Sequence, residues 1–532
     1  MGAAGIVRSI PARSRISRPL EEGVVPAPAQ AWGLVNSNRS RWRHILTKTE
    51  NLARWIRALL VALACGALAS WTQAATDIAN TLVRTCSNQL DGSQYSDAVL
   101  NDFRGSRFPS PKTGGFKVTS VQQVWLALPA YCLVKGTIQP TSPGGVDPAV
   151  KDPSHRVRDI NYQIYIPAQW NGKFVQLGGG GFAWKSDVVA AGTQTSQQFA
   201  LPLQGMALAN YAVVLSDAGA DGSNGAFDPD FVRPGRNLAD VAKQEMVKNF
   251  GQDSIKKSLD VGLYLLKKLT GAAPTDTYFV GISTGGRQAL KAIANWPDAY
   301  DGVVAGAPPV DETNLLKTLQ VPDAVNDWTT NWASASAMLT SLFGQDVSPQ
   351  TLSDGMGATS RYLADVAIES GADYDGYHRL LDQLAPVWNV RPDELVPFLR
   401  MSARQKRDGG KGKKIVIYQG TSDFLVPCTQ AGEFVRQLNG LPAGGQVAAA
   451  DIRNTVRAYF VEDYSHGFYN TNAVLKRLGL TPLQLNWNAL ADLDRWVHDD
   501  QARGGAPSLA RNASGEIPTG QALSAWRCVA AP

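Results

Sequence analysis

The sequence predicts an α/β fold with a mostly parallel central sheet and an inserted, mainly helical lid domain. Short apolar runs rich in β-branched and aromatic residues suit strands that are covered on both faces. These runs alternate with stretches of helical periodicity, which indicates a parallel sheet flanked by helices. The alternation lapses between about residues 311 and 410, and this lapse predicts the insertion.

The predicted strands follow one another along the chain from about residue 157 onward. Apolar and polar residues alternate within 157–166, and the later strands are near-continuous apolar runs at 173–177, 211–215, 277–281, 302–305, 414–418 and 457–461. A helix is predicted over 254–269, where apolar residues recur at helical spacing, and another over 286–295. Together these elements supply a sheet large enough to form one main core.

The segment 311–410 contains helical patterns at 360–370 and 377–384, and no convincing strand. It ends in a basic, glycine-rich linker at 404–414. A helical insertion that leaves the edge of a sheet is where a lid would lie, and a second, independent helical domain is the alternative. We therefore expect a leader and signal peptide at 1–74, a core split into 75–310 and 411–532, and a lid at 311–410.

The amino-terminal segment differs in charge from the rest of the chain. The formal charge is +5 overall, but residues 1–75 carry +7 and the remainder −2, so no nucleic-acid partner is expected. Arg54 and Arg57 precede an apolar run at 58–70 and small residues up to Ala74, the pattern of a secretory signal peptide. The run is shorter than the ~20 apolar residues that span a bilayer.

We therefore expect cleavage after Ala74 and a secreted or periplasmic mature protein without stable membrane insertion. An uncleaved membrane anchor and a lipoprotein signal at Cys65 are the alternatives. Residues 1–50 read as an overlong start or a disordered leader and do not enter the fold prediction.

An exported chain with an even number of cysteines is expected to form disulfides. The mature sequence has Cys86, Cys132, Cys428 and Cys528. Three pairings are possible, and proximity in sequence favours Cys86–Cys132, which leaves Cys428–Cys528. Free buried thiols are the alternative. No Cys/His cluster suggests zinc, and we expect neither a metal nor a cofactor.

The motif Gly281-Ile-Ser-Thr-Gly285 lies between a predicted strand and a predicted helix, the context of a nucleophile elbow that exposes Ser283. A serine hydroxyl needs a base, and His466 lies in a loop just beyond the last predicted strand. Asp423 follows the strand at 414–418 and would fix the imidazole tautomer. The order Ser–Asp–His is that of α/β-hydrolases. Asp463 is a rival acid, whereas His155, His378 and His498 fit structural roles better.

A tetrahedral intermediate also needs donors for its oxyanion. The loop Gly178-Gly-Gly-Gly181 directly follows the strand at 173–177. Backbone N–H groups of Gly179 or Gly180, together with that of Thr284, would supply two donors, each typically worth ~3 kcal/mol of transition-state stabilisation. A plain flexible turn is the alternative. A phosphate loop is excluded because no Lys-Ser/Thr pair follows.

These motifs resemble the tannase/feruloyl esterase family, which also contains hydrolases of mono(2-hydroxyethyl) terephthalate. The resemblance is carried by the glycine loop, by the segment around Ser283 at 278–289, and by shorter stretches at 227–229, 301–308, 420–423, 465–467 and 496–498. It runs from about Cys86 to the carboxyl terminus and is poor in the insertion. The resemblance implies an α/β-hydrolase with a lid, acting on esters of aromatic acids such as gallate, ferulate or terephthalate.

Two features depart from the family pattern. The family usually joins the positions before the nucleophile and before the catalytic histidine by a disulfide, whereas this chain has Ile282 and Ser465 there. Because both cysteines are absent, no orphan thiol is left, and packing must hold these loops. The family's lid also usually carries an Asp-rich calcium loop, which 311–410 lacks, so we expect no calcium in that form.

The sequence thus predicts an exported serine ester hydrolase that acts on small-molecule aromatic-acid esters through an acyl-enzyme. Esters of aliphatic polyester oligomers or lipids are alternative substrates, and a serine peptidase or a non-catalytic binding relative is an alternative function. In the insertion, an aromatic ring or a carboxylate of the substrate would contact the tryptophans or arginines, and packing in the core is the alternative for the tryptophans. The residues in question are Trp328, Trp332, Trp388, Arg400 and Arg404.

Overall fold

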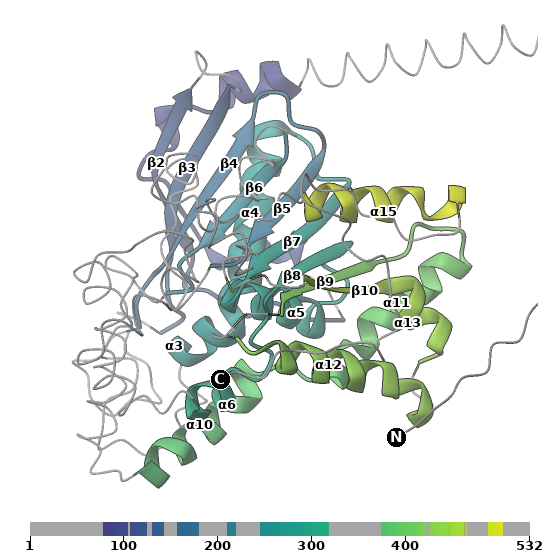
Figure 1. Cartoon of the computed structure of the whole chain (residues 1–532). Helices are drawn as coiled ribbons and strands as arrows, with labels where there is room; N and C mark the ends of the chain where they lie inside the picture. Colours follow the sequence, from purple (N-terminus) through teal and green to yellow (C-terminus); the bar gives the residue numbers. More distant parts are fainter. Residues whose placement is uncertain are drawn as a thin grey trace, which may run out of the picture. The chain divides into compact units, whose positions relative to one another are not determined.

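The computed structural model describes residues 78–104, 107–124, 130–142, 157–179, 210–219, 245–318, 374–421, 423, 426–445, 447–461, 464, 466 and 488–503. At their centre is a sheet in the order β1-β2-β3-β4-β6-β5-β7-β8-β9-β10 (Figure 1). The strands are β1 (Gln94–Tyr95), β2 (Phe116–Val124), β3 (Tyr131–Ile138), β4 (Ile160–Pro167), β5 (Lys173–Leu177), β6 (Ala212–Ser216), β7 (Asp276–Ile282), β8 (Gly302–Gly306), β9 (Lys414–Gly420) and β10 (Val456–Val461).

The half of the sheet from β6 to β10 is parallel, as predicted. Strands β6, β5, β7, β8, β9 and β10 pair in parallel along this order. Every residue of β8 and β9 is buried, which explains their continuous apolar sequences. Neighbouring Val303 and Val304 point into the two different core clusters, one on each face of the sheet. The prediction of an α/β-hydrolase fold with a mostly parallel sheet is confirmed.

The other half of the sheet is antiparallel and contains three strands that the sequence reading did not identify. Strands β1, β2, β3 and β4 pair in antiparallel order, and β4 joins the parallel half by pairing with β6. Strand β2 alternates in burial, so its sequence carries a weaker signal than a continuous apolar run. The sequence predicts the first strand from about residue 157, but the sheet begins earlier in the chain, with β1 at Gln94–Tyr95.

Helices cover both faces of the sheet. They are α3 (Glu245–Lys248), α4 (Ser254–Thr270), α5 (Thr284–Asn295), α6 (Glu312–Thr318), α10 (Tyr374–Trp388), α11 (Val396–Arg407), α12 (Cys428–Gly440), α13 (Ala449–Thr455) and α15 (Ala489–Arg503). Shorter helical turns are η1 (Asn88–Leu90), η2 (Asp97–Phe103), η8 (Asn249–Asp253), η9 (Pro392–Leu395) and η10 (Leu441–Gly444). Helices α4 and α5 occur where the sequence predicts them, and α4 ends at Gly271, whose left-handed backbone (φ 75°) terminates the helix.

Helix α15 packs on the face of β8 and β9 opposite to α4 and α5 (Figure 1). Its Asp494 accepts hydrogen bonds from Tyr278 Oη at 2.7 Å, Tyr211 Oη at 3.1 Å and Lys173 Nζ at 2.6 Å. Tyr278 and Lys173 belong to β7 and β5, and Tyr211 precedes β6. One carboxylate of the last described helix therefore binds three neighbouring strands at their amino ends.

Much of the predicted lid, 319–373, lies outside the described residues, as do the leader and signal peptide at 1–74. Helix α11, which falls within the range assigned to the lid, places Phe398 and Leu399 in the main core cluster. This part of 311–410 therefore packs as core. Within the described ranges, no helix combines the length and hydropathy needed to cross a bilayer.

The predicted disulfide Cys86–Cys132 is confirmed. Cys132 lies in β3, and Cys86 follows the helical residues 78–85. The two Cα atoms are 6.1 Å apart, and both side chains are fully buried. Cys428, the first residue of α12, is also disulfide-bonded, and its predicted partner Cys528 lies outside the described residues.

Replacing Cys86 and Cys132 together with alanine is expected to lower the free energy of unfolding by about 4 kcal/mol. The disulfide joins residues 46 positions apart, so breaking it frees a long loop in the unfolded chain. Urea unfolding followed by circular dichroism measures this loss. A variant whose unfolding midpoint equals that of the oxidised parent chain would contradict the expectation.

Asp97 provides a pH-dependent contribution to stability near the amino-terminal strands. Its Oδ1 accepts hydrogen bonds from Thr113 N and Thr113 Oγ1, both at 2.8 Å, and its Oδ2 accepts one from Arg104 Nη1 at 2.8 Å. Burial raises the pKa of Asp97, but the hydrogen bonds from Arg104 and Thr113 outweigh it and lower the pKa to about 2. The ordinary value is 3.8, so folding favours the ionised carboxylate.

Because the folded-state pKa is depressed, this stabilisation is present above pH 3.8 and is lost as the pH falls toward about 2. The difference in unfolding free energy between the parent chain and Asp97→Asn is therefore expected to shrink over that window. Urea unfolding at a series of pH values measures it. A difference that stays constant across the window would exclude Asp97 as the titrating group.

Candidate active site

Ser283 lies in a sharp turn between strand β7 and helix α5. Its backbone has φ 60° and ψ −131°, a conformation that L-residues rarely adopt and that marks a strained functional turn. Ser283 N donates to Gly306 O at 2.8 Å, and Ser283 O accepts from Gly286 N at 2.7 Å. Strand β8 and the first turn of α5 therefore hold the strained backbone in place. A nucleophile elbow requires a sharp strand-to-helix turn of this kind, and the role of Ser283 as the nucleophile stays a prediction.

Three glycines make the turn possible because their backbones are in direct contact. A Cβ at Gly281 would lie 2.1 Å from Gly285 O, and a Cβ at Gly178 would lie 2.5 Å from Gly285 Cα. Gly178 N also donates to Val280 O at 2.9 Å. The start of the glycine loop is therefore packed against the amino end of α5, next to the predicted donors Gly179 and Thr284. Gly180 lies outside the described residues.

Asp423 and His466 are hydrogen-bonded to each other. His466 Nδ1 is 2.8 Å from Asp423 Oδ2, and both residues are buried. A carboxylate oxygen can only accept, so the proton lies on Nδ1 and Nε2 is left to act as a base. Asp423 Oδ1 accepts a second hydrogen bond from Val426 N at 2.9 Å. The acid is therefore fixed on both of its oxygens.

The order of the strands brings these residues to the same edge of the sheet. Ser283 directly follows β7, Asp423 follows β9 and His466 follows β10. Strands β7, β8, β9 and β10 are parallel neighbours, so their carboxyl ends meet at one edge. The structure gives the contact between Asp423 and His466, and the approach of Ser283 to His466 stays a prediction.

A buried ion pair lies directly behind the elbow. Arg287 of α5 is fully buried, and its Nε is 2.6 Å from Glu312 Oε2 at the start of α6. Arg287 Nη1 donates to the carbonyls of Gly251 and Trp388, both at 2.9 Å. Burial lowers the pKa of Arg287 and raises that of Glu312, and the attraction between the two charges opposes both shifts. The pair links the elbow helix to α6 and α10.

The described residues predicted to contact the substrate do not lie together at one site. Trp388 is 2% exposed and packs edge-on against Phe250, with 5.0 Å between ring centroids, so the structure places it in the core. Arg400 and Arg404 are exposed on α11, which leads into the amino end of β9, away from Ser283. Arg404 Nε is 3.7 Å from Asp408 Oδ2. Trp328 and Trp332 lie outside the described residues.

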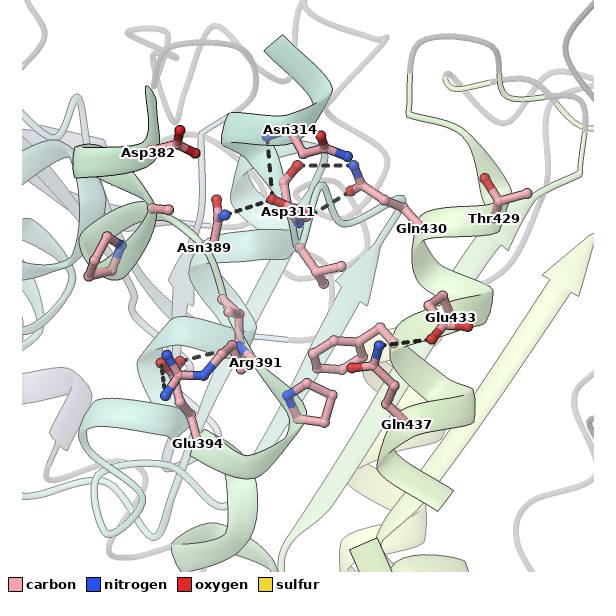
Figure 2. A pocket seen from close by; sticks show the side chains of 16 residues that line it. Asp311, Asn314, Asp382, Asn389, Arg391, Glu394, Thr429, Gln430, Glu433 and Gln437 are labelled. Atoms are coloured by element: carbon pink, nitrogen blue, oxygen red, sulfur yellow. Dashed lines mark hydrogen bonds and ion pairs between the residues drawn. The ribbon is translucent and has the colours of Figure 1, made fainter. Parts of the chain in front are cut away.

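A cavity of about 590 Å³ lies between α6, the carboxyl end of α10 and α12 (Figure 2). Its polar groups largely bond one another: Gln430 Nε2 donates to Asp311 O at 3.0 Å, and Asn389 Nδ2 donates to Asp311 Oδ1 at 2.6 Å. The lining includes neither Ser283 nor the Asp423–His466 pair. The cavity is therefore distinct from the predicted catalytic residues.

Two buried polar groups lie beside the site and are not evident from the sequence. Gln419 lies in β9 and donates to Asp423 Oδ2 at 2.8 Å, and Glu312 accepts from Thr284 Oγ1 at 3.4 Å. The available signal for Gln419 was an amide at the end of an apolar strand, four residues before the predicted acid. No comparable local signal marks Glu312.

Among the described residues, no group of three or more His, Cys, Asp or Glu side chains is arranged to hold a metal ion. The expectation that the family's calcium loop is absent concerns 311–410, of which 319–373 lies outside the described residues.

The sequence of this chain is similar to sequences of known proteins over the first part of the core. Residues 146–335 match the family model described as tannase and feruloyl esterase. The chain is 32% identical to an uncharacterized esterase of Agrobacterium fabrum over 227 residues, which are 41% of this chain and 36% of that protein. It is 30% identical to a probable feruloyl esterase of Arthroderma benhamiae over 166 residues, 31% of this chain and 28% of that protein.

A third relative is the mono(2-hydroxyethyl) terephthalate hydrolase of Piscinibacter sakaiensis, 29% identical over 182 residues, 34% of this chain and 27% of that protein. The matched stretch spans well under half the length of each of these relatives. Feruloyl esterase B from Aspergillus oryzae superposes with a TM-score of 0.47 at 16% identity, covering 76% of this chain and 91% of that chain. Residues 146–335 of this chain are thus similar to the tannase and feruloyl esterase family.

Proposed function

We propose that this protein is a serine carboxylic ester hydrolase in which Ser283, His466 and Asp423 act as nucleophile, base and orienting acid. The observation that carries the proposal is the buried Asp423–His466 hydrogen bond, which leaves His466 Nε2 as a base, at the sheet edge where the strained Ser283 turn lies. A nucleophile, a base and a group that orients the base form the minimal set for acyl transfer.

In the first step, Ser283 Oγ attacks the ester carbonyl carbon while His466 Nε2 takes the hydroxyl proton. The carbonyl oxygen becomes an oxyanion, for which the N–H groups of Gly179 or Gly180 and of Thr284 are the proposed donors. Collapse of the tetrahedral intermediate breaks the bond to the alcohol, which leaves with the proton from His466. Water then attacks the acyl-enzyme by the same route, and the carboxylic acid is released as Ser283 recovers its proton.

We propose esters of aromatic acids as the substrates. The match of residues 146–335 to the tannase and feruloyl esterase model, and relatives named feruloyl esterase and mono(2-hydroxyethyl) terephthalate hydrolase, support this class. Export to the periplasm or the medium is also proposed, supported by the signal-peptide pattern that ends at Ala74 and by the Cys86–Cys132 disulfide.

A fluorophosphonate probe followed by peptide mass spectrometry tests the nucleophile. We expect a single labelled serine, Ser283, and loss of the label in Ser283→Ala. The same preparation is assayed with methyl gallate, methyl ferulate, a terephthalate monoester and p-nitrophenyl acyl esters of increasing chain length. Turnover of the aromatic-acid esters supports the proposed substrates, whereas turnover of the aliphatic esters alone overturns them. Absence of both label and turnover would leave a binding protein as the function.

A further inference from the structure

We propose that Gln419 is a positioning residue that holds Asp423 in the orientation His466 requires. The proposal rests on the function proposed above, because it assigns Gln419 a part in the same reaction. Gln419 lies in β9 and is fully buried. Its Nε2 donates to Asp423 Oδ2 at 2.8 Å, the oxygen that also contacts His466 Nδ1.

The position of Gln419 in the strand is one where an apolar side chain is expected. Side chains of a strand alternate between faces, and Ile415, Ile417 and Gln419 therefore point to the same side of β9. Ile415 and Ile417 belong to the main hydrophobic core. An amide buried at the end of this apolar row costs free energy unless its polar atoms are paired, so packing alone does not account for it.

The surrounding acceptors fix the orientation of the amide. Besides Asp423 Oδ2, Gln419 Nε2 donates to Val426 O at 3.1 Å. Both neighbours are acceptors, so the amide carbonyl cannot replace the NH₂ group without facing two oxygens. Gln419 Oε1 has no hydrogen-bond partner among the described residues. A buried acceptor left unpaired typically costs ~1–3 kcal/mol. The side chain therefore donates a hydrogen bond to Asp423 while its own Oε1 stays without one.

The hydrogen bonds of Gln419 and Val426 together determine how the carboxylate lies. Val426 N donates to Asp423 Oδ1 at 2.9 Å, and Gln419 Nε2 donates to Oδ2. With a donor on each oxygen, the carboxylate cannot rotate away from His466 without breaking one of these bonds. Gln419 also donates to the carbonyl of Val426, so one amide group contacts both Asp423 and Val426.

The variant Gln419→Met tests the proposal because methionine matches the glutamine in size but has no donor. We expect kcat for ester hydrolysis to fall about 10- to 100-fold, the range typical when a partner that orients a metal-binding histidine is removed, with KM nearly unchanged. The substrate site is intact in this variant, and the loss lies in the chemical step.

Gln176→Met is the matched control. Gln176 is 2% exposed in the parallel strand β5, and its Nε2 donates to Ile255 O at 2.7 Å and Ser258 Oγ at 3.0 Å. Its Oε1 also accepts from Tyr300 Oη at 2.7 Å, so removing this amide is expected to lower stability at least as much as the change at Gln419 and to leave kcat unchanged. Equal losses of kcat in the two folded variants, or no loss in Gln419→Met, would overturn the proposal.

A second measurement does not depend on turnover. A histidine Nδ1–H bonded to a carboxylate gives a far-downfield proton resonance, which His466→Ala identifies by its absence. We expect Gln419→Met to shift or broaden this resonance and Gln176→Met to leave it in place. If the parent chain hydrolyses no ester, the proposed function fails and this resonance alone decides the role of Gln419. If Gln419→Met does not fold, Gln419→Asn, whose amide falls one methylene short, replaces it in both measurements.

Discussion

Replacing Ser283 with alanine is expected to lower kcat for ester hydrolysis by about 10⁶-fold, with KM little changed. The hydroxyl forms the bond to the acyl group, and no acyl-enzyme can form without it. The residual rate comes from binding and the oxyanion donors alone. Steady-state kinetics at saturating ester, with a pre-steady-state burst as the sign of the acyl-enzyme, measure the effect.

Ser402→Ala is the matched control for this substitution. Ser402 is buried in α11, and its Oγ donates to Lys413 O at 2.8 Å, on the amino side of β9. Ser402 Oγ also accepts from Lys413 N at 2.9 Å and Thr455 Oγ1 at 3.0 Å, so its replacement is expected to cost ~1–3 kcal/mol of stability and to leave kcat intact. Turnover by Ser283→Ala at the rate of the parent chain would remove Ser283 as the nucleophile and would end the case for acyl transfer at the elbow.

Replacing Asp423 with asparagine is expected to lower kcat by about 10⁴-fold, the second largest effect. Asparagine keeps the shape of the side chain but can present an NH₂ group to His466 Nδ1. The imidazole then takes the other tautomer, with its proton on Nε2, and cannot accept the proton of Ser283. Steady-state kinetics with a substrate that the parent chain hydrolyses measure the loss.

Asp463→Asn separates Asp423 from the rival acid in the sequence. We expect Asp463→Asn to retain the kcat of the parent chain, because Asp423 is the carboxylate that accepts the observed hydrogen bond from His466 Nδ1. A loss confined to Asp463→Asn would reverse the assignment. Circular dichroism and the urea midpoint of both variants distinguish a chemical defect from unfolding.

The parallel half of the sheet was predictable because its strands are buried on both faces and read as continuous apolar runs. Strands β8 and β9 were found within one or two residues for this reason. Strand β2 was missed because its exposed face breaks the apolar pattern, and the short pair β1–β2 carries almost no local signal. The antiparallel edge depends on contacts with β3 and β4 that lie elsewhere in the chain.

In the candidate site, too, residues with a local sequence signal could be predicted, and residues that depend on distant contacts could not. The contact between Asp423 and His466 could be predicted because each residue follows a strand in a recognisable local context. The Arg287–Glu312 pair could not, since its stability depends on a buried environment built from α5, α6 and α10. Gln419 could not be predicted because nothing in the sequence shows which hydrogen-bond partners a glutamine in a strand will have. Trp388 illustrates the reverse case, a residue whose chemistry suggested a ligand but whose surroundings are core.

The backbone contact among Gly178, Gly281 and Gly285 limits how this protein can be altered by evolution or in the laboratory. A Cβ at each of the three positions would meet backbone atoms of one of the others, and those atoms are present whatever the partner residue is, so even combined substitutions there meet the same obstacle. A mutant library aimed at new substrates should keep these three codons fixed. Substitutions are better placed at other positions around Ser283, where a side chain is already present and can be replaced singly.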